Sequence, residues 1–247
     1  MKVTECFWEI QNIGKKTVEI GVEKEDKFLE ADINEASSGY QYVVVKVPMD
    51  KVDFNVGLSN MGFSMIEVQM NILKKSKDFD YDSPFIKEIY NDTSFEEVVN
   101  ENDFNEILSK ITPDMFSTDR IVLDNHFNEN IGCERYKNWM KTDFKANKSR
   151  FLKIIYKGIH VGFYMFKLEN DIAHAILGGI YKGYQGYGLG VLTPSALMLY
   201  SKKGGAKIKM MKTSISSNNI PVLQFYNYFN FKITSMTYVF IKHIVSI

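Results

Sequence analysis

The chain has 247 residues, and its 30 Lys and Arg against 30 Asp and Glu give a formal net charge of zero. This balance argues against a general nucleic-acid or membrane-surface binder, which needs an electropositive face. Hydrophobic residues make up 45% of the chain, yet no stretch approaches the ~20 apolar residues of a membrane span, so we expect a globular protein in the cytoplasm.

The first 80 residues predict a small α/β unit. The segment 40–47 is rich in β-branched and aromatic residues, which predicts a buried strand. A helix is expected over 51–60, and the alternation of apolar and polar residues over 64–71 predicts a half-buried strand. The charged segment 74–83 then predicts an exposed linker. We therefore place a first, non-catalytic unit at residues 1–80.

Residues 92–247 predict a larger unit with the order β-α-α-β-β-β-α-β-α-β. Asp103, with Glu106 three residues later, predicts the N-cap of its first helix, which ends before Pro113. The other elements are expected near 95–99, 130–144, 151–156, 161–168, 172–181, 189–203, 207–213, 219–229 and 232–243. This order predicts a mixed, mostly antiparallel sheet flanked by helices, of the α/β (α+β) class.

Two short segments of the chain match each other. Gly62 and Asn230 fall at the same place in segments that each follow a predicted helix and precede a predicted strand. Both residue types tolerate the left-handed conformation that commonly ends a helix. In this alignment Leu58 is the counterpart of Tyr226. The match favours a duplicated half-domain in which only the second copy carries chemistry.

Residues 178–190 form a glycine-rich turn that joins a predicted strand directly to a predicted helix. Such a turn exposes consecutive backbone N–H groups at the positive end of a helix, which favours phosphate. The turn has no Gly-Lys-Ser/Thr ending, which argues against a nucleoside-triphosphate P-loop. The antiparallel meander before the turn lacks the βαβ context of a Rossmann site.

This turn resembles the acetyl-CoA signature of the Gcn5-related N-acetyltransferase (GNAT) superfamily, Gln/Arg-x-x-Gly-x-Gly/Ala. The matching residues are Gln185, Gly186, Tyr187, Gly188, Leu189 and Gly190. Asn219, Tyr226 and Phe231 match the second element of the family, on the next helix and at the family's spacing. The resemblance covers about 93–247 and implies a GNAT domain there, preceded by a smaller unit that resembles a degenerate half of one.

Within that superfamily the chain is most similar to the TDP-fucosamine acetyltransferase branch, bacterial enzymes that acetylate the amino group of a nucleotide-linked sugar. The similarity lies in residues 119–127 and 136–139. The chain departs from that branch in having no Pro after Asp124 and in having Lys182 where many members have Pro. These departures bear on the sugar-nucleotide interpretation more than on the fold.

The resemblance implies acetyl-CoA as co-substrate, and no metal is expected. The residues it implies in coenzyme binding are Gly178, Gly179 and Ile180 for the pantetheine and thioester, Gln185 to Gly190 for the pyrophosphate, and Asn219 for the pantetheine arm. It implies Tyr226 as a further coenzyme contact and as the general acid that protonates the coenzyme thiolate.

A general base is expected on the strand that precedes the turn. His174 has the parity of Ile176, which places its imidazole on the same sheet face as Ile180. His174 either accepts the proton of the amine, directly or through water, or packs as an ordinary histidine. Asp124 and His126, in the loop before the second helix, either read a substrate group or are solvated turn residues.

These observations predict an N-acetyltransferase that moves an acetyl group to a primary amine by direct attack, with the amino group of a nucleotide-linked sugar as the favoured acceptor. No nucleophilic cysteine is needed, since Cys6 and Cys133 lie outside the matched motifs. Another amine (a peptide N-terminus, a polyamine or an aminoglycoside) and a non-catalytic acyl-CoA-binding module stay open. Acidic residues in the acceptor cleft would favour a polyamine or an aminoglycoside, and basic and aromatic ones a nucleotide sugar. We expect small-molecule partners and neither nucleic acid nor a membrane, with a homodimer left open.

Overall fold

The computed structural model describes residues 1–80, 83–128 and 130–244. The first half of the chain contains β1 (Lys2–Glu5), α1 (Trp8–Ile13), β2 (Thr17–Gly21), α2 (Glu30–Ser37), β3 (Tyr42–Pro48), α3 (Val52–Asn60) and β4 (Ser64–Lys75). The second half contains α4 (Pro84–Asn91), β5 (Thr93–Glu97), α5 (Glu101–Lys110), α6 (Arg120–Leu123), α7 (Asn130–Lys145), β6 (Arg150–Tyr156), β7 (Ile159–Glu169), β8 (Ile172–Ile180), α8 (Leu192–Lys202), β9 (Met210–Ser216), α9 (Ile220–Tyr228) and β10 (Lys232–His243).

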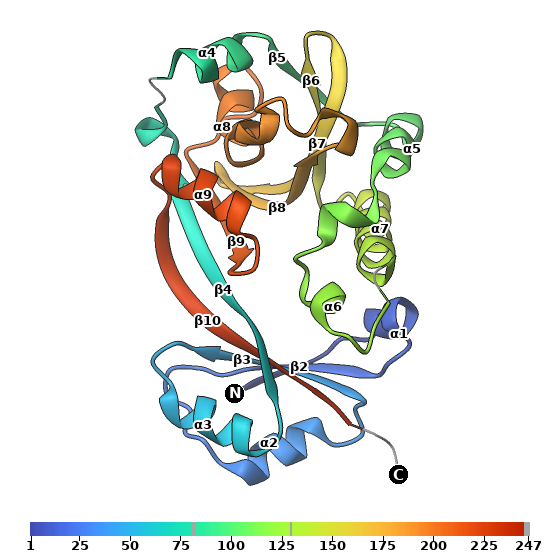
Figure 1. Cartoon of the computed structure of the whole chain (residues 1–247), viewed down its shortest axis with the longest axis vertical. Coiled ribbons are helices and arrows are strands. Elements are labelled where there is room, and N and C mark those ends of the chain that lie inside the picture. The colour runs from blue at the N-terminus through green and yellow to red at the C-terminus, as the bar shows by residue number, and fades with distance from the viewer. Residues whose placement is uncertain (81–82, 129, 245–247) are drawn as a thin grey trace.

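The described residues form one ten-stranded sheet in the order β1-β2-β3-β10-β4-β9-β8-β7-β6-β5. Figure 1 shows β2 and β3 with α2 and α3 at one end of an elongated molecule, and β5 to β8 with α4, α5 and α8 toward the other. The pairs β2–β3 and β8–β9 are parallel, and the other neighbours are antiparallel. The predicted fold class is confirmed: a mixed, largely antiparallel sheet flanked by helices.

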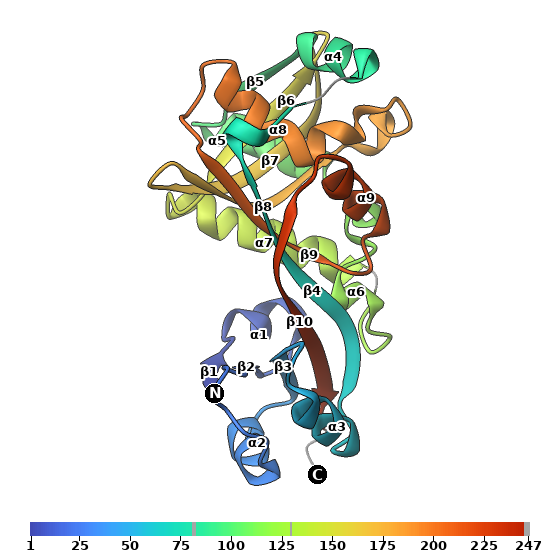
Figure 2. The same ribbon diagram turned by 90° about the vertical axis from the view of Figure 1, so that its left-hand side faces the viewer.

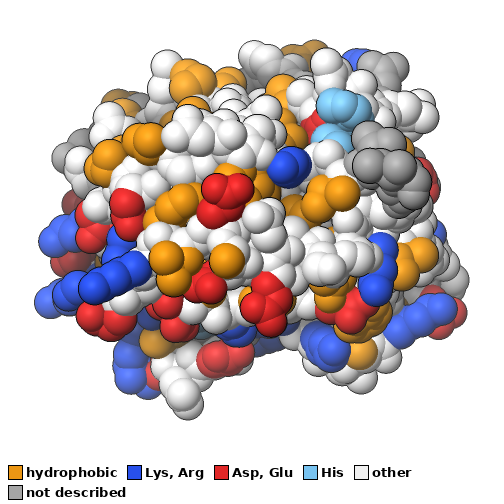
Figure 3. Space-filling model, turned by 90° about the horizontal axis from the view of Figure 1, so that it is seen from below, with side chains coloured by type: hydrophobic (Ala, Val, Ile, Leu, Met, Phe, Trp, Pro, Cys, Tyr) orange, Lys and Arg blue, Asp and Glu red, His pale blue; other side chains and the backbone are white. Residues whose placement is uncertain are grey.

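Helices cover both faces of the sheet in the larger half, with α4, α8 and α9 on one face and α5 and α7 on the other. Successive residues of β7 show why. Tyr164 and Phe166 join the core under α8, whereas Phe163 and Met165 join the core under α5 and α7. Acidic and basic side chains are interspersed over the face shown in Figure 3. Within the described part of the chain, no helix has the length and apolar character needed to cross a bilayer.

The long strands β4 and β10 link the two halves, and both views show them running between the ends of the molecule (Figures 1 and 2). β4 belongs to the first half but pairs with β9 of the second, and β10 belongs to the second half but pairs with β3 of the first. The two strands also pair with each other. The division of the chain into units 1–80 and 92–247 stays a prediction, and one continuous sheet spans both.

The two halves repeat one arrangement at an interval of 168 residues. β3, α3 and β4 begin at Tyr42, Val52 and Ser64, and β9, α9 and β10 begin 168 residues later with the same lengths. Gly62 and Asn230 end the two helices with positive φ angles of 79° and 53°. The duplicated half-domain that the sequence indicates is confirmed.

Three details differ from the sequence-based prediction. Asn100, rather than Asp103, caps α5, since its Oδ1 accepts a hydrogen bond from the backbone N–H of Asp103 at 3.0 Å. The segment 74–83 is more than a linker, because β4 continues to Lys75 and Lys74 is buried; residues 81 and 82 lie outside the described part. The prediction also omitted β1, α1, β2, α2 and α4.

Candidate functional site

The strands β8 and β9 diverge in the middle of the sheet. They pair in parallel only where Ile172–His174 faces Met210–Lys212 within the described chain. Beyond that point β8 stays beside β7, whereas β9 stays beside β4. At the start of the divergence, Thr213 Oγ1 donates a hydrogen bond to the carbonyl oxygen of Ala175 at 3.0 Å. The sheet therefore opens between these two strands.

A cavity of about 740 Å³ occupies this opening. The residues expected to bind coenzyme that line it are Gly178, Gly179, Ile180, Gln185, Gly186, Gly188, Gly190, Asn219 and Tyr226. Leu189 is buried in the core under α8 instead, and Tyr187 is 71% exposed; neither lines the cavity. The structure thus brings the glycine turn and the two residues of α9 and its cap to one place.

Gly188 and Gly190 show why the turn needs glycine. Gly188 has a φ of +76°, a left-handed conformation that other residues rarely adopt. A Cβ on Gly190 would lie 2.9 Å from the ring of Phe225, which lines the same cavity. Gln185 Nε2 closes the turn by donating a hydrogen bond to the carbonyl oxygen of Ile180 at 3.2 Å. The turn therefore presents backbone close to the start of α8, where the helix dipole favours an anion.

Tyr226 lies on α9, which Asn219 caps at its N-terminus. The Tyr226 ring is buried and packs edge-on against Phe231, with ring centroids 4.7 Å apart. Burial raises the pKa of Tyr226 to about 12, although hydrogen bonding with Tyr164 and Thr213 acts in the opposite direction. The Tyr226 hydroxyl is therefore protonated at neutral pH, and it is able to donate a proton within the cavity.

His174 does not share a sheet face with Ile180, so the predicted parity is wrong. Ile176 is an extra residue in the pairing of β8 with β7, and such a bulge reverses the alternation of side chains. Ile180 joins the core under α8, whereas His174 lines a different cavity together with Trp139 of α7. The catalytic role of His174 stays a prediction.

That second cavity has a volume of about 700 Å³ and adjoins the first. Gln69, Arg120 and Tyr136 line both cavities. α1, β2 and β3 of the first half supply one wall, and α7, β8 and β9 of the second half supply the other. Sequence reasoning missed Arg120 and also Glu67, which β4 contributes to the first cavity. The scarcity of arginine, with three in the chain, was the one available signal for Arg120.

Cys6 also lines the second cavity. Burial raises the pKa of its thiol to about 11, so that the thiol is protonated at neutral pH and a weak nucleophile. Burial likewise raises the pKa of Cys133, which lies in the core under α5 and α7. Direct attack by an amine is therefore more compatible with this site than a cysteine-bound intermediate.

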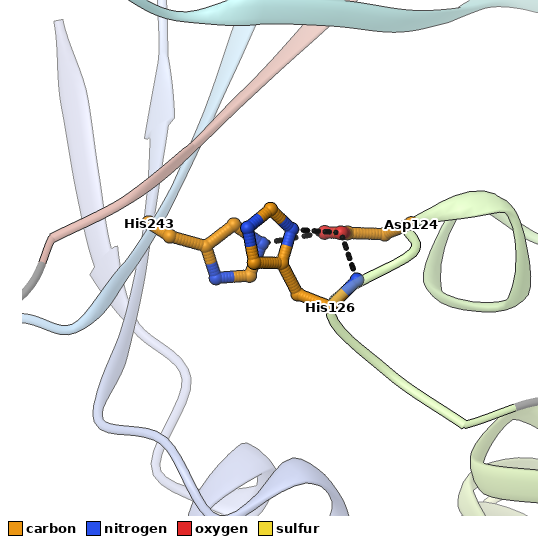
Figure 4. A group of neighbouring side chains, drawn as sticks. All are labelled: Asp124, His126 and His243. Atoms are coloured by element: carbon orange, nitrogen blue, oxygen red, sulfur yellow. Dashed lines mark hydrogen bonds and ion pairs between the residues drawn. The ribbon is translucent and has the colours of Figure 1, made fainter.

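Asp124, His126 and His243 gather at a place that belongs to neither cavity (Figure 4). The two Asp124 carboxylate oxygens lie 2.9 Å from His126 Nδ1 and 2.7 Å from His243 Nε2. Asp124 is only 4% exposed, so the interpretation as a solvated turn residue is wrong for it. The three ligand atoms lie within 4.8 Å of one another, a donor set that could hold a divalent metal. Here hydrogen bonds join the three groups and tie β10 to the loop after α6.

Neither a family model nor a curated protein matches the sequence. Solved structures do match the fold. A GCN5-related N-acetyltransferase from Sphaerobacter thermophilus matches with a TM-score of 0.52 and 9% identity, over 82% of this chain and 59% of that one. A tandem GNAT protein from the clavulanic acid biosynthesis pathway matches with a TM-score of 0.52 and 11% identity, over 92% of this chain and 75% of that one. The chain has the GNAT fold.

The GNAT likeness is not confined to the second half. A functionally unknown conserved protein from Staphylococcus epidermidis matches with a TM-score of 0.61 and 11% identity, over 93% of this chain and 85% of that chain. These identities are low, so the likeness concerns the fold. In this GNAT fold the opening between β8 and β9 carries the candidate site.

Proposed function

We propose that this protein is an acetyl-CoA-dependent N-acetyltransferase that acetylates a primary amine by direct attack. One observation carries the proposal: the turn Gln185–Gly190 and the pair Asn219 and Tyr226, which lie far apart in the chain, line the same cavity. That cavity lies where β8 and β9 diverge. A fold shared with N-acetyltransferases raises the prior for this activity, and the placement of these residues gives it a chemical basis.

The cavity fits acetyl-CoA in shape and in the groups it presents. Gly190 leaves a space that a Cβ could share with Phe225 only if the ring moved, and Gly188 keeps the backbone of the turn in a left-handed conformation. When bound, acetyl-CoA supplies an acetyl group activated as a thioester. The turn would hold the pyrophosphate through backbone N–H groups, and Asn219 would hold the pantetheine arm.

The residues of the chain divide the remaining work. Backbone N–H groups of 178–180 would polarise the thioester carbonyl at the opening. Tyr226 keeps its proton at neutral pH because of its raised pKa, and it would give that proton to the leaving thiolate. His174 would accept the proton of the amine from the second cavity, which it lines. A bound metal has no part in these steps.

For the acceptor, we favour the amino group of a nucleotide-linked sugar, the substrate of the TDP-fucosamine acetyltransferase branch that the sequence resembles. The second cavity supports this choice over a polyamine, because its lining contains the aromatic residues Trp8, Tyr42, Tyr136 and Trp139. Its four cationic side chains also outnumber its two carboxylates, Glu9 and Glu19. A polyamine would find the opposite balance favourable.

Thiol release from acetyl-CoA tests the proposal, with purified protein and a panel of amines that includes TDP-amino sugars, polyamines and an aminoglycoside. We expect turnover with an amino sugar and a fall in kcat of about 100-fold or more in Tyr226→Phe, while acetyl-CoA affinity persists. Tyr228→Phe is the matched control, because Tyr228 is on the same helix and is 54% exposed. Tight acetyl-CoA binding without turnover on any amine would instead indicate an acyl-CoA-binding module.

A further inference from the structure

The second cavity is built jointly by the two halves of the chain. Trp8, Glu19 and Tyr42 come from α1, β2 and β3, whereas Trp139 and Lys212 come from α7 and β9. The cavity adjoins the proposed donor site, since Arg120, Tyr136 and Gln69 line both. A molecule in this cavity would therefore extend from the first half of the chain to the opening between β8 and β9.

The carboxylates that line this cavity already have cationic partners. Arg135 donates to Glu9 through both Nε and Nη2, at 2.8 and 2.6 Å from Oε1. Lys46 Nζ lies 2.9 Å from Glu19 Oε2. Arg120 and Lys212 line the same cavity, which has no further carboxylate among its described lining residues. The cavity therefore carries two positive charges that the protein does not neutralise there.

Arg120 is placed to contact a ligand. Its guanidinium makes no hydrogen bond or ion pair with any residue that the structure describes, and its Nε is enclosed without a partner. The nearest acid in sequence, Asp119, instead accepts hydrogen bonds from Tyr136 Oη at 2.6 Å and from the backbone of Ile121 at 2.9 Å. An enclosed guanidinium without partners is unfavourable, so a ligand that supplies acceptor atoms would be bound strongly.

Tyr42 provides a second, independent sign of a missing ligand. It is 1% exposed, it lines the same cavity, and its hydroxyl has no hydrogen-bond partner among the described residues. Trp8 and Trp139 line the cavity as well, at 44% and 40% exposure. Buried polar atoms are nearly always satisfied in native proteins, so two unsatisfied ones in a single cavity point to a polar ligand.

We propose that the second cavity is the acceptor subsite and that Arg120 there binds an anionic group of the acceptor, a phosphate or a carboxylate. The guanidinium offers parallel N–H donors that match either group, and Tyr42 Oη donates a further hydrogen bond. The subsite rests on the proposed acetyl transfer for its role. Its assignment gives the first half of the chain a function: to form the wall that recognises the acceptor.

Tryptophan fluorescence tests this subsite without relying on acetyl transfer, because both tryptophans of the chain line the cavity. Pyrophosphate and succinate are titrated separately at constant ionic strength, with and without coenzyme A, which competes for the glycine turn. We expect a saturable change for at least one anion in both conditions. The anion that binds more tightly identifies phosphate or carboxylate as the preferred group.

Arg120→Gln should weaken the apparent affinity for that anion by at least about 10-fold, and Arg120→Lys by less. Arg150→Gln is the control, since Arg150 lines neither cavity and pairs with Glu97. Thermal melting of each variant checks that it is folded. A saturable wild-type response that Arg120→Gln and Arg120→Lys both leave unchanged, or no saturable response at all, overturns the subsite. Saturable binding without thiol release would overturn the acetyl-transfer proposal while leaving the anion site in place.

Discussion

Gln69 and Thr237 face each other across β4 and β10, and each is the counterpart of the other in the two halves of the chain. The pairs on either side of them obey the same rule. Ser64 faces Ile241, and a shift of 168 residues converts this pair into Lys232 facing Leu73. The bulges obey it too, since the pairing passes over one residue near the start of each strand. The centre of the sheet therefore has a local twofold axis at Gln69 and Thr237.

The raised pKa of Tyr226 predicts the alkaline side of the pH profile. A general acid must be protonated to act, and a pKa of about 12 keeps Tyr226 protonated throughout the range from about pH 6 to about pH 10. We expect kcat/KM for thiol release to rise as the acceptor amine loses its proton and then to stay level up to about pH 10. A descending limb in wild type below that pH, absent from Tyr226→Phe, would contradict the assignment.

Substitution of Gly190 should weaken coenzyme binding. A Cβ there would lie 2.9 Å from the Phe225 ring, so that Gly190→Ala pushes the ring into the space of the proposed donor site. We expect acetyl-CoA affinity, measured by titration calorimetry, to fall by about 10-fold and stability to fall by about 1–3 kcal/mol. Gly183→Ala is the control, because a Cβ at Gly183 meets nothing within 4 Å. Equal affinity in the two variants would argue against the turn as the coenzyme site.

The buried pair of Arg135 and Glu9 should hold α1 against α7. Glu9 is 3% exposed, so Arg135→Met leaves its carboxylate buried without a partner. We expect a loss of about 3–5 kcal/mol in the free energy of urea unfolding, most of which Glu9→Gln in the same chain restores. Lys157→Met, which breaks a pair of exposed residues with Asp92, should change stability by less than about 1 kcal/mol. A similar small effect for both single variants would show that the first pair contributes little.

Glu106 should contribute to stability against acid. Hydrogen bonds from Lys110, Lys153 and His160 hold the pKa of its carboxyl well below its usual range. A depressed carboxyl pKa stabilises the fold above the unfolded value of about 4.3, and this stabilisation is lost as the pH falls further. We expect the unfolding free energy of wild type to fall more steeply between about pH 5 and about pH 3 than that of Glu106→Gln. Parallel curves would refute this role, and solvent screening keeps the effect modest because the side chain is 38% exposed.

The order of elements in the second half was predictable because those segments are long and regularly patterned. The shorter segments of the first half were not. β1 has four residues and α1 six, lengths at which a periodic pattern is barely defined. At the start of α5, Asn100 and Asp103 are both good capping residues, and only the structure shows which hydrogen bond forms.

The site was predictable in part, for a similar reason. The turn and the positions of Asn219 and Tyr226 are local patterns, and one cavity unites them. The bulge at Ile176 leaves no trace in the alternation of β8, so the face of His174 was assigned wrongly. The second cavity depends on contacts between halves that are remote in sequence, and no local pattern encodes them. Arg120 therefore stood out only after folding.

The exchange of β4 and β10 carries a record of how such a chain arose. A single half would leave an open sheet edge, so an ancestor with one copy would have completed its sheet only as a pair of identical chains. Fusion made the pairing permanent and relaxed selection on one of two equivalent sites. Lys51 now stands where the other half has Asn219, and Leu58 where it has Tyr226. What began as a second catalytic copy became a surface free to evolve toward a new ligand.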